Sequence, residues 1–244
     1  MLTVTGLTVR FPSFRGGFHE PVRDFSLFLG AGEILGLTGP SGCGKTAFCS
    51  ALLGMVEHPG FVRAGSIRFD LACGDAVDLA RLSEKEWRRI RGKSISLISQ
   101  NPVQGLNPGQ KIGSHFIDAV RAHEPKASRA ACLSRAEALL DAALFSRPDR
   151  IIRSYPFELS GGMCQRALIA LALAHKPALL IADEPTTALD MRSEAEVLRL
   201  FLWIREAYHT AVLLVSHDPL VLSRISDRTI EGGAGGLRGG AGRV

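Results

Sequence analysis

The stretch Gly39-Pro40-Ser41-Gly42-Cys43-Gly44-Lys45-Thr46 matches the pattern G-x-x-x-x-G-K-[ST]. It follows an apolar strand-like segment, 34–38, and precedes a helix-like segment, 45–55. Glycines allow backbone N–H groups to turn inward around the phosphates of a nucleotide. The helix N-terminus and the Lys45 ammonium add positive charge, and the Thr46 hydroxyl suits Mg²⁺. The alternative is a plain glycine turn that matches the pattern by chance. The strand-like segment before the loop and the helix-like segment after it favour a phosphate-binding P-loop instead.

A second constellation is Leu179-Leu180-Ile181-Ala182-Asp183-Glu184, where two carboxylates end a continuous apolar run. Such a run is typical of a buried parallel strand, and ligands bind at the carboxyl ends of such strands. Asp183 suits Mg²⁺ binding through water, and Glu184 can orient or deprotonate an attacking water. The alternative is that both are solvated loop acids. Together with the P-loop they predict a nucleoside triphosphatase.

A third motif, Leu159-Ser160-Gly161-Gly162-Met163, opens a helical segment. Ser160 and the amides of Gly161 and Gly162 form a second phosphate-binding helix N-terminus, although Ser-Gly-Gly alone is also an ordinary helix cap. At this point the chain resembles the ABC ATPase family, whose signature LSGGQ reads LSGGM here. The resemblance implies that this motif closes on ATP held by the P-loop of a second cassette.

The family's remaining motifs follow in order. The resemblance identifies Gln100 as the Q-loop glutamine, a contact of Mg²⁺ and water. It identifies Asp190, in Ala188-Leu189-Asp190, as part of the D-loop that communicates across the cassette dimer. His217 matches the switch histidine that contacts the γ-phosphate. With Lys45 and Glu184, His217 completes the predicted catalytic set.

Two further site residues are expected near the nucleotide. An aromatic side chain should stack on adenine just before the first turn, and Phe11 sits best in register, with Phe14 and Phe18 as alternatives. Cys43 lies inside the P-loop beside positive charge, which stabilises a thiolate. We therefore expect Cys43 to be open to solvent in the empty site and to react with a maleimide faster than Cys49.

The rest of the chain indicates an α/β fold, because strand-like and helix-like segments alternate. Strands are expected at 2–11, 25–29, 34–38, 67–71, 95–99, 179–182 and 211–215, and helices at 45–55, 83–90, twice within 113–143, 163–175 and 194–208. The resemblance implies a RecA-like P-loop NTPase core with a parallel sheet, an N-terminal antiparallel β subdomain and an inserted α-helical subdomain. We expect one ATPase domain over 1–231, with core 1–85 and 164–231 and helical subdomain 86–163. Seven of the thirteen residues in 232–244 are glycine, which predicts a flexible tail.

Composition sets broader limits. The chain is 46% hydrophobic and 22% charged, as in ordinary globular proteins, and its net charge of +5 suits phosphates, nucleic acid or an anionic membrane surface. Its five cysteines have no metal-ligand spacing and are predicted to be reduced thiols. The N-terminus shows no signal-peptide pattern, and no apolar stretch approaches the ~20 residues that cross a bilayer. A peripheral subunit is therefore expected.

Three stretches resemble the peptide and nickel importer branch of the family: Gln100–Pro108, Tyr155–Met163 and Ile181–Thr187. This implies an importer of peptides, nickel or a metal–metallophore complex, with ATP and Mg²⁺ as cofactors. Its partners would be a second, nonidentical ATPase subunit, two membrane permease subunits and an extracytoplasmic substrate-binding protein, without nucleic acid. Such a subunit works at the cytoplasmic face of the inner membrane. The strand pair that normally follows Asp227-Arg228 is not expected from the sequence.

Two other classes of function remain open at this point. One is a nontransport ABC ATPase of a multisubunit enzyme, resembling that of the carbon–phosphorus lyase complex. The other is nucleic-acid work, as in repair or ribosome-associated ABC ATPases, which the single contiguous cassette disfavours.

Overall fold

The computed structural model describes residues 1–13, 16–71, 74–100, 105–233 and 235–241. Its strands are β1 (Leu2–Pro12), β2 (Phe18–Leu29), β3 (Ile34–Thr38), β4 (Phe61–Asp70), β5 (Ala76–Asp78), β6 (Ile95–Ile98), β7 (Leu179–Asp183), β8 (Ala211–Val215), β9 (Arg228–Glu231) and β10 (Leu237–Ala241). Its α-helices are α1 (Lys45–Leu52), α2 (Glu84–Ile90), α3 (Ile112–His123), α4 (Arg129–Ala142), α5 (Pro148–Arg153), α6 (Gly161–Ala172), α7 (Met191–Tyr208) and α8 (Pro219–Ile225).

One sheet is parallel and has the order β6-β7-β8-β3-β9. Strands β3, β7 and β8 are buried at every position, as their continuous apolar sequences require. The carboxyl ends of β3 and β7 lead directly into the P-loop and the Asp183-Glu184 pair. The sheet therefore brings the two motifs to one edge.

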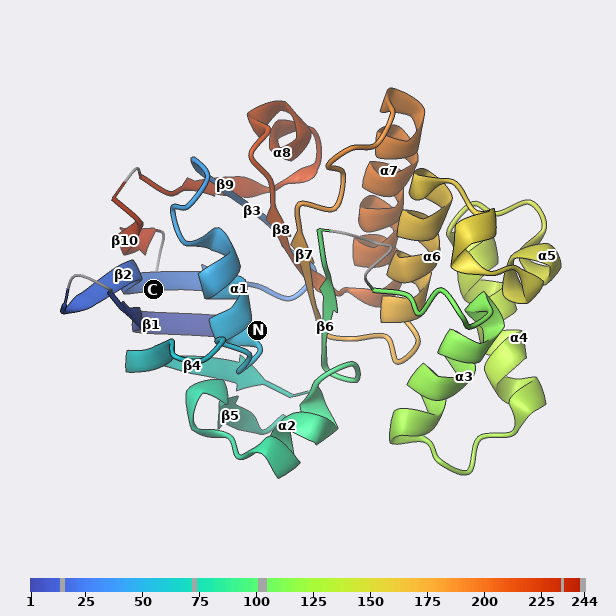
Figure 1. Cartoon of the computed structure of the whole chain (residues 1–244), viewed down its shortest axis with the longest axis horizontal. Helices are drawn as coiled ribbons and strands as arrows, with labels where there is room; N and C mark the ends of the chain where they lie inside the picture. The colour runs from blue at the N-terminus through green and yellow to red at the C-terminus, as the bar shows by residue number, and fades with distance from the viewer. Residues whose placement is uncertain (14–15, 72–73, 101–104, 234, 242–244) are drawn as a thin grey trace.

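The second sheet has the order β10-β2-β1-β4-β5. Strand β1 pairs antiparallel with both β2 and β4, and β10 joins β2 in the parallel sense. Figure 1 shows this sheet at one end of the molecule, helices α3 to α5 at the other, and the parallel sheet between them. The expected α/β class, with a parallel core, an antiparallel subdomain and a helical subdomain, is confirmed.

The parallel sheet divides the hydrophobic core into two layers. Alternate residues of β8 show the division: Val212 and Leu214 pack with α6, α7 and α8, whereas Leu213 and Val215 pack with α1 and the antiparallel sheet. Helix α1 thus lies between the two sheets, with Phe48 and Leu52 fully buried. The P-loop that begins α1 is consequently held by both sheets.

The expected boundary of the helical subdomain at residue 86 is wrong. Residues 95–98 form β6, which is an edge strand of the parallel sheet. Trp87 and Ile90 of α2 pack in the core beneath the antiparallel sheet. The helical subdomain therefore begins after β6, because an edge strand needs a strand partner and α2 carries its apolar side toward the other sheet.

The expectation for the tail is also corrected over its described part. Strand β9 pairs with β3 and β10 pairs with β2, so the strand pair that the sequence does not suggest is present. Leu237 is fully buried. Backbone hydrogen bonds hold these strands, and backbone hydrogen bonds do not depend on side chains. A glycine-rich segment with one apolar anchor therefore forms a strand without showing apolar alternation.

Candidate nucleotide site

The P-loop connects β3 to α1 and depends on three glycines with positive φ: Gly39 at 148°, Gly42 at 80° and Gly44 at 97°. These conformations are accessible to glycine and strained for other residues. A Cβ on Gly44 would lie 2.3 Å from the carbonyl oxygen of Pro21, so the loop also touches β2 directly. The Lys45 ammonium donates to the carbonyl oxygens of Gly39 at 2.7 Å and Pro40 at 3.1 Å. The ammonium is therefore held inside the loop, where it would contact the phosphate oxygens of a bound nucleotide.

A cavity of about 340 Å³ opens in front of this loop. Its walls combine the P-loop with the ends of β6 and β7. The lining residues are Pro21, Ser41, Gly42, Gly44, Lys45, Thr46, Ala47, Gln100, Asp183 and Glu184. The structure thus brings together eight of the residues that the sequence predicts for the site, although they come from three separate parts of the chain.

Asp183 lines the cavity and is 9% exposed. Burial raises the pKa of its carboxyl, a hydrogen bond with the Thr46 side chain opposes that rise, the neighbouring Glu184 adds to it, and Lys45 opposes it. A buried carboxylate with a hydroxyl oxygen beside it is a donor set that Mg²⁺ prefers. Thr46 and Asp183 therefore fit a Mg²⁺ ion, as the sequence predicts, with Gln100 on the same cavity.

Glu184 follows β7 with a φ of 53°, a left-handed conformation that is uncommon for this residue type. Its Oε2 accepts a hydrogen bond from the Thr187 hydroxyl at 3.1 Å and lies 2.7 Å from Nδ1 of His217. The His217 side chain is 62% exposed and that of Glu184 is 12% exposed. The predicted base, which lines the cavity, and the predicted switch histidine are therefore in direct contact. Strained backbone of this kind concentrates at functional sites.

The signature motif lies elsewhere, at the N-terminus of α6. Ser160 is its N-cap and accepts a hydrogen bond from the Met163 amide at 3.3 Å. A Cβ on Gly161 would meet no heavy atom within 4 Å, whereas one on Gly162 would lie 2.3 Å from Ser193 Oγ. Gly161 thus leaves an open surface, and Gly162 permits close packing against α7. None of the three signature residues lines the P-loop cavity.

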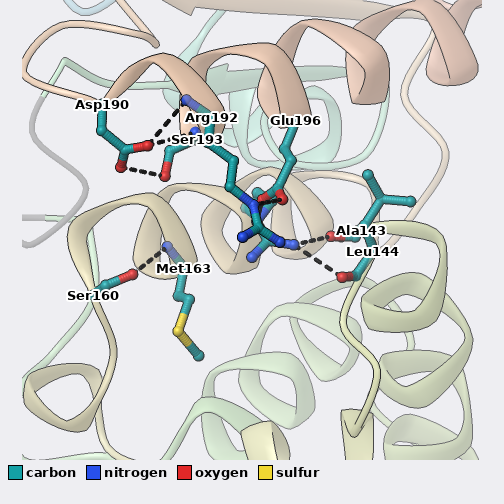
Figure 2. A network of polar contacts seen from close by, with 9 residues as sticks. Ala143, Leu144, Ser160, Met163, Asp190, Arg192, Ser193 and Glu196 are labelled. Atoms are coloured by element: carbon teal, nitrogen blue, oxygen red, sulfur yellow. Dashed lines mark hydrogen bonds and ion pairs between the residues drawn. The ribbon is translucent and has the colours of Figure 1, made fainter.

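Asp190 caps α7 and accepts hydrogen bonds from the amides of Arg192 and Ser193, both at 3.0 Å. The Ser193 hydroxyl donates to its second carboxylate oxygen at 2.7 Å. Figure 2 shows this cap facing the end of α6 where Ser160 and Met163 lie. The predicted D-loop residue is therefore an N-cap that holds Ser193 against the signature helix.

Two predicted positions are not brought to the cavity as expected. Phe11 is partly buried against the core on the same side of β1 as Val9, and it does not line the P-loop cavity. Phe18 is 53% exposed and Phe14 lies outside the described residues, so the adenine-stacking residue stays a prediction. Cys43 is 2% exposed, so the expectation of an open thiol is wrong. Only the backbone of Cys43 remains a candidate for phosphate contact.

Three residues of the site are not among the predicted site residues: Pro21, Thr187 and Ser193. Pro21 approaches the P-loop because β2 passes beneath α1, which depends on sheet packing. Thr187 reaches Glu184 through a turn, and Ser193 meets Gly162 through helix packing. For two of them the sequence gives a weak signal, because Thr187 closely follows Asp183-Glu184 and Ser193 closely follows Asp190.

The sequence was compared with models of known protein families. The model of the ABC transporter family matches residues 22–187, from β2 through the loop after β7. This chain belongs to the ABC transporter family. The resemblance inferred from the P-loop, the signature and the paired carboxylates is thereby confirmed.

Several relatives are named as ATP-binding proteins of transport or import. The chain is 38% identical over 229 residues to the oligopeptide transport ATP-binding protein OppD of Bacillus subtilis, covering 93% of this chain and 62% of the relative. It is 37% identical over 231 residues to the glutathione import ATP-binding protein GsiA of Salmonella choleraesuis, covering 94% of this chain and 37% of that one. It is 40% identical over 228 residues to the probable D,D-dipeptide transport ATP-binding protein DdpD of Escherichia coli, covering 93% and 67%. The chain thus spans only part of the length of these relatives.

Solved structures give the same fold. The dimeric structure of MJ0796, a bacterial ABC transporter cassette, superposes with a TM-score of 0.83 at 24% identity, covering 98% of this chain and 97% of that one. A dimeric post-hydrolysis state of MJ0796 bound to ADP and Pi gives a TM-score of 0.81 at 25% identity, with the same coverage. The expected P-loop ATPase cassette fold is confirmed.

Proposed function

We propose that this chain is the ATP-binding subunit of a peptide-type importer and that it hydrolyses ATP at an interface between two cassettes. The observation that carries the proposal is the separation of two phosphate-binding sites within one chain. The P-loop cavity contains Lys45, Thr46, Asp183 and Glu184, while the signature helix begins at Ser160 outside that cavity. An exposed Gly161 at a helix N-terminus suits the phosphates of a nucleotide held by a second cassette.

Within the cavity the chain's residues divide the work of phosphoryl transfer. The P-loop amides and Lys45 hold the β- and γ-phosphates. Thr46 and Asp183 would hold Mg²⁺, with Gln100 as a third oxygen donor, and the ion would neutralise charge on the phosphates. Glu184 orients and deprotonates the attacking water, and His217 fixes the Glu184 carboxylate through their 2.7 Å contact.

The cargo class is inferred from the relatives. OppD, GsiA and DdpD are named for transport of oligopeptides, glutathione and D,D-dipeptides, and all align over more than nine-tenths of this chain. Peptides are therefore the favoured cargo, nickel has no support from these names, and the carbon–phosphorus lyase-like alternative is not favoured. In an importer of short peptides, the partners of this chain would be two permease subunits, a substrate-binding protein and a second, nonidentical cassette.

The place of action follows from the same proposal. No helix in the described part of the chain is long and apolar enough to span a bilayer. Under the proposed function the permease subunits carry out the transport step, and this chain would dock on them at the cytoplasmic face of the membrane.

Replacing Glu184 by Gln tests the proposed chemistry. Gln keeps the shape of the side chain and loses the base, so Mg-ATP binding should persist while turnover falls ~10²–10⁴-fold. Steady-state ATPase of the assembled transporter and equilibrium ATP binding by the chain give the two readouts. Glu206→Gln is the matched control, because the Glu206 side chain is 73% exposed and lies outside the cavity. Turnover of Glu184→Gln within threefold of wild type would remove Glu184 from the mechanism.

A further inference from the structure

The described residues of the glycine-rich segment, 232–233 and 235–241, run beside the P-loop. The Gly232 amide donates to the carbonyl oxygen of Thr38, the last residue of β3, at 2.7 Å. Further on, β10 pairs with β2, with Leu237 opposite Val22. The segment is thus fixed at one end to the strand that enters the P-loop and at the other to the strand that passes beneath it.

Backbone meets backbone along this contact. A Cβ on Gly39 would lie 2.7 Å from the carbonyl oxygen of Gly232. The Pro21 carbonyl oxygen would lie 2.3 Å from a Cβ on Gly44 and 2.8 Å from a Cβ on Gly236. Real Cβ atoms do not approach backbone atoms this closely. The P-loop, β2 and the glycine-rich segment are therefore in direct contact through four glycines: Gly39 and Gly44 of the P-loop, and Gly232 and Gly236 of the tail.

Two buried side chains fill the remaining space. A Cβ on Gly232 would lie 2.7 Å from Leu237 Cδ2 and 3.1 Å from Cys43 Sγ. Leu237 is fully buried and Cys43 is 2% exposed. Because a close-packed interior cannot absorb an added methyl group without a shift, strain at Gly232 passes either to Leu237 or to the P-loop through Cys43. A Cβ on Gly42 would meet no heavy atom within 4 Å, so this position of the loop has no comparable close neighbour.

We propose that Gly232 is a positioning residue for nucleotide binding, which it serves by setting the P-loop against the glycine-rich segment. The inference rests on the proposed nucleotide site and assigns the support of that site to the tail. The P-loop amides must hold phosphate oxygens to within a few tenths of an ångström, and the shell behind them determines that placement. The Cys43 thiol is the side-chain contact through which an added methyl group at Gly232 displaces the loop.

The experiment is a double-mutant cycle on the full chain, read out as the Kd for Mg-ATP by titration calorimetry. Gly232→Ala should weaken Mg-ATP binding about tenfold, because misplacing a site by less than 1 Å costs affinity on this order. In the Cys43→Ala background the same substitution should weaken binding by less than about threefold, because the thiol that transmits the strain is gone. Gly233→Ala is the matched control, since a Cβ there meets no atom within 4 Å.

The outcomes separate the alternatives. Equal Kd values for Gly232→Ala and Gly233→Ala would overturn the inference, as would an equal loss with and without the thiol. If Gly232→Ala alone does not fold, Cys43→Ala and the double variant decide: a double variant that folds and binds within threefold of Cys43→Ala supports the inference, and one that does not fold or bind overturns it. A wild-type chain that does not bind Mg-ATP would overturn the proposed function and this inference with it.

Discussion

The Cys43 thiol lies beneath the P-loop, between Gly39 and Gly232, with its sulfur 3.9 Å from the Lys45 ammonium. Its side chain is 2% exposed, and this burial prevents contact with a reagent. Accessibility decides, because a thiol that a reagent cannot reach does not react at any protonation state. The Cys49 thiol is buried too, so a reagent cannot reach it. Burial also raises the pKa of this thiol well above its ordinary value.

We therefore expect a maleimide to label native Cys43 and Cys49 slowly, with or without Mg-ATP. The matched comparison moves the thiol two residues along the loop: Ser41→Cys, made with Cys43→Ser, places it at an exposed position. That thiol should react at least about tenfold faster. Mass-spectrometric mapping of modification against time measures both rates. Equal rates for Cys43 and the relocated thiol would show that the P-loop exposes Cys43 in solution.

Residue identities at the site follow from motifs, and their environments do not. Lys45, Thr46, Asp183 and Glu184 are each recognisable because the chemistry demands one residue type at a fixed place after a strand. The left-handed backbone of Glu184 cannot be inferred from the sequence, since nothing in a Glu favours it. The burial of Cys43 has the same origin: it depends on a segment almost 200 residues away in the chain.

At the scale of elements, helices α6 and α7 form a clamp behind the signature. Arg166, in the second turn of α6, donates from Nη1 to the carbonyl oxygens of Ala143 and Leu144, both at 3.0 Å, and thereby caps the C-terminal end of α4. Its Nε lies 3.3 Å from a carboxylate oxygen of Glu196 on α7, and its guanidinium stacks on Phe145 at 4.5 Å. One side chain thus ties the signature helix to the helical subdomain and to the helix that Asp190 caps.

Removing this side chain should destabilise the protein. The Arg166 side chain is 12% exposed, so Arg166→Gln leaves the Ala143 and Leu144 carbonyl oxygens without their donor and removes a largely buried ion pair with Glu196. We expect the free energy of unfolding to fall by about 2 kcal/mol, as for other buried polar groups that lose a partner. Arg192→Gln is the control: Arg192 pairs with the same Glu196 but is 89% exposed, so its loss should cost under about 0.5 kcal/mol. Urea unfolding measures both, and equal losses would contradict the clamp.

The sequence predicts those strands whose structure depends on the pattern of their side chains. Strands β3, β7 and β8 are continuous apolar runs, and each is fully buried in the parallel sheet. Strand β10 could not be predicted, because its pairing with β2 depends on backbone hydrogen bonds and on one buried side chain, Leu237. The start of the helical subdomain was misplaced for a related reason: the sequence shows that β6 is a strand but not which sheet it joins.

At the scale of the whole molecule, the parallel sheet holds the P-loop cavity at its carboxyl edge, and α6 presents the signature at a separate place. Gly161 has open space around its Cβ position, and Met191, beside the Asp190 cap, is 88% exposed. The exposed Met191 side chain and the open N-terminus of α6 at Gly161 form a surface that a second cassette would cover. Under the proposed function, one chain supplies half of each of two ATP sites.

A chain with two half-sites should bind ATP alone and hydrolyse it poorly. We expect the isolated chain to be mostly monomeric by size-exclusion chromatography with light scattering. Adding the second cassette and the membrane subunits should raise turnover at least about tenfold, because hydrolysis requires charge stabilisation that one half-site does not supply. A stable, fully active homodimer formed without ATP would count against a nonidentical partner.

Gly161→Asp separates assembly from folding in the same experiment. An added side chain at Gly161 meets no atom of its own chain, so folding and Mg-ATP binding at the P-loop should match wild type. In the assembled complex the new carboxylate would face the phosphates of the partner's ATP, and like charges repel there. Stimulation by the partner should therefore be lost while Kd for Mg-ATP on the isolated chain is unchanged. If Gly161→Asp is stimulated as strongly as wild type, the signature helix does not face a nucleotide, and the two-cassette site is wrong.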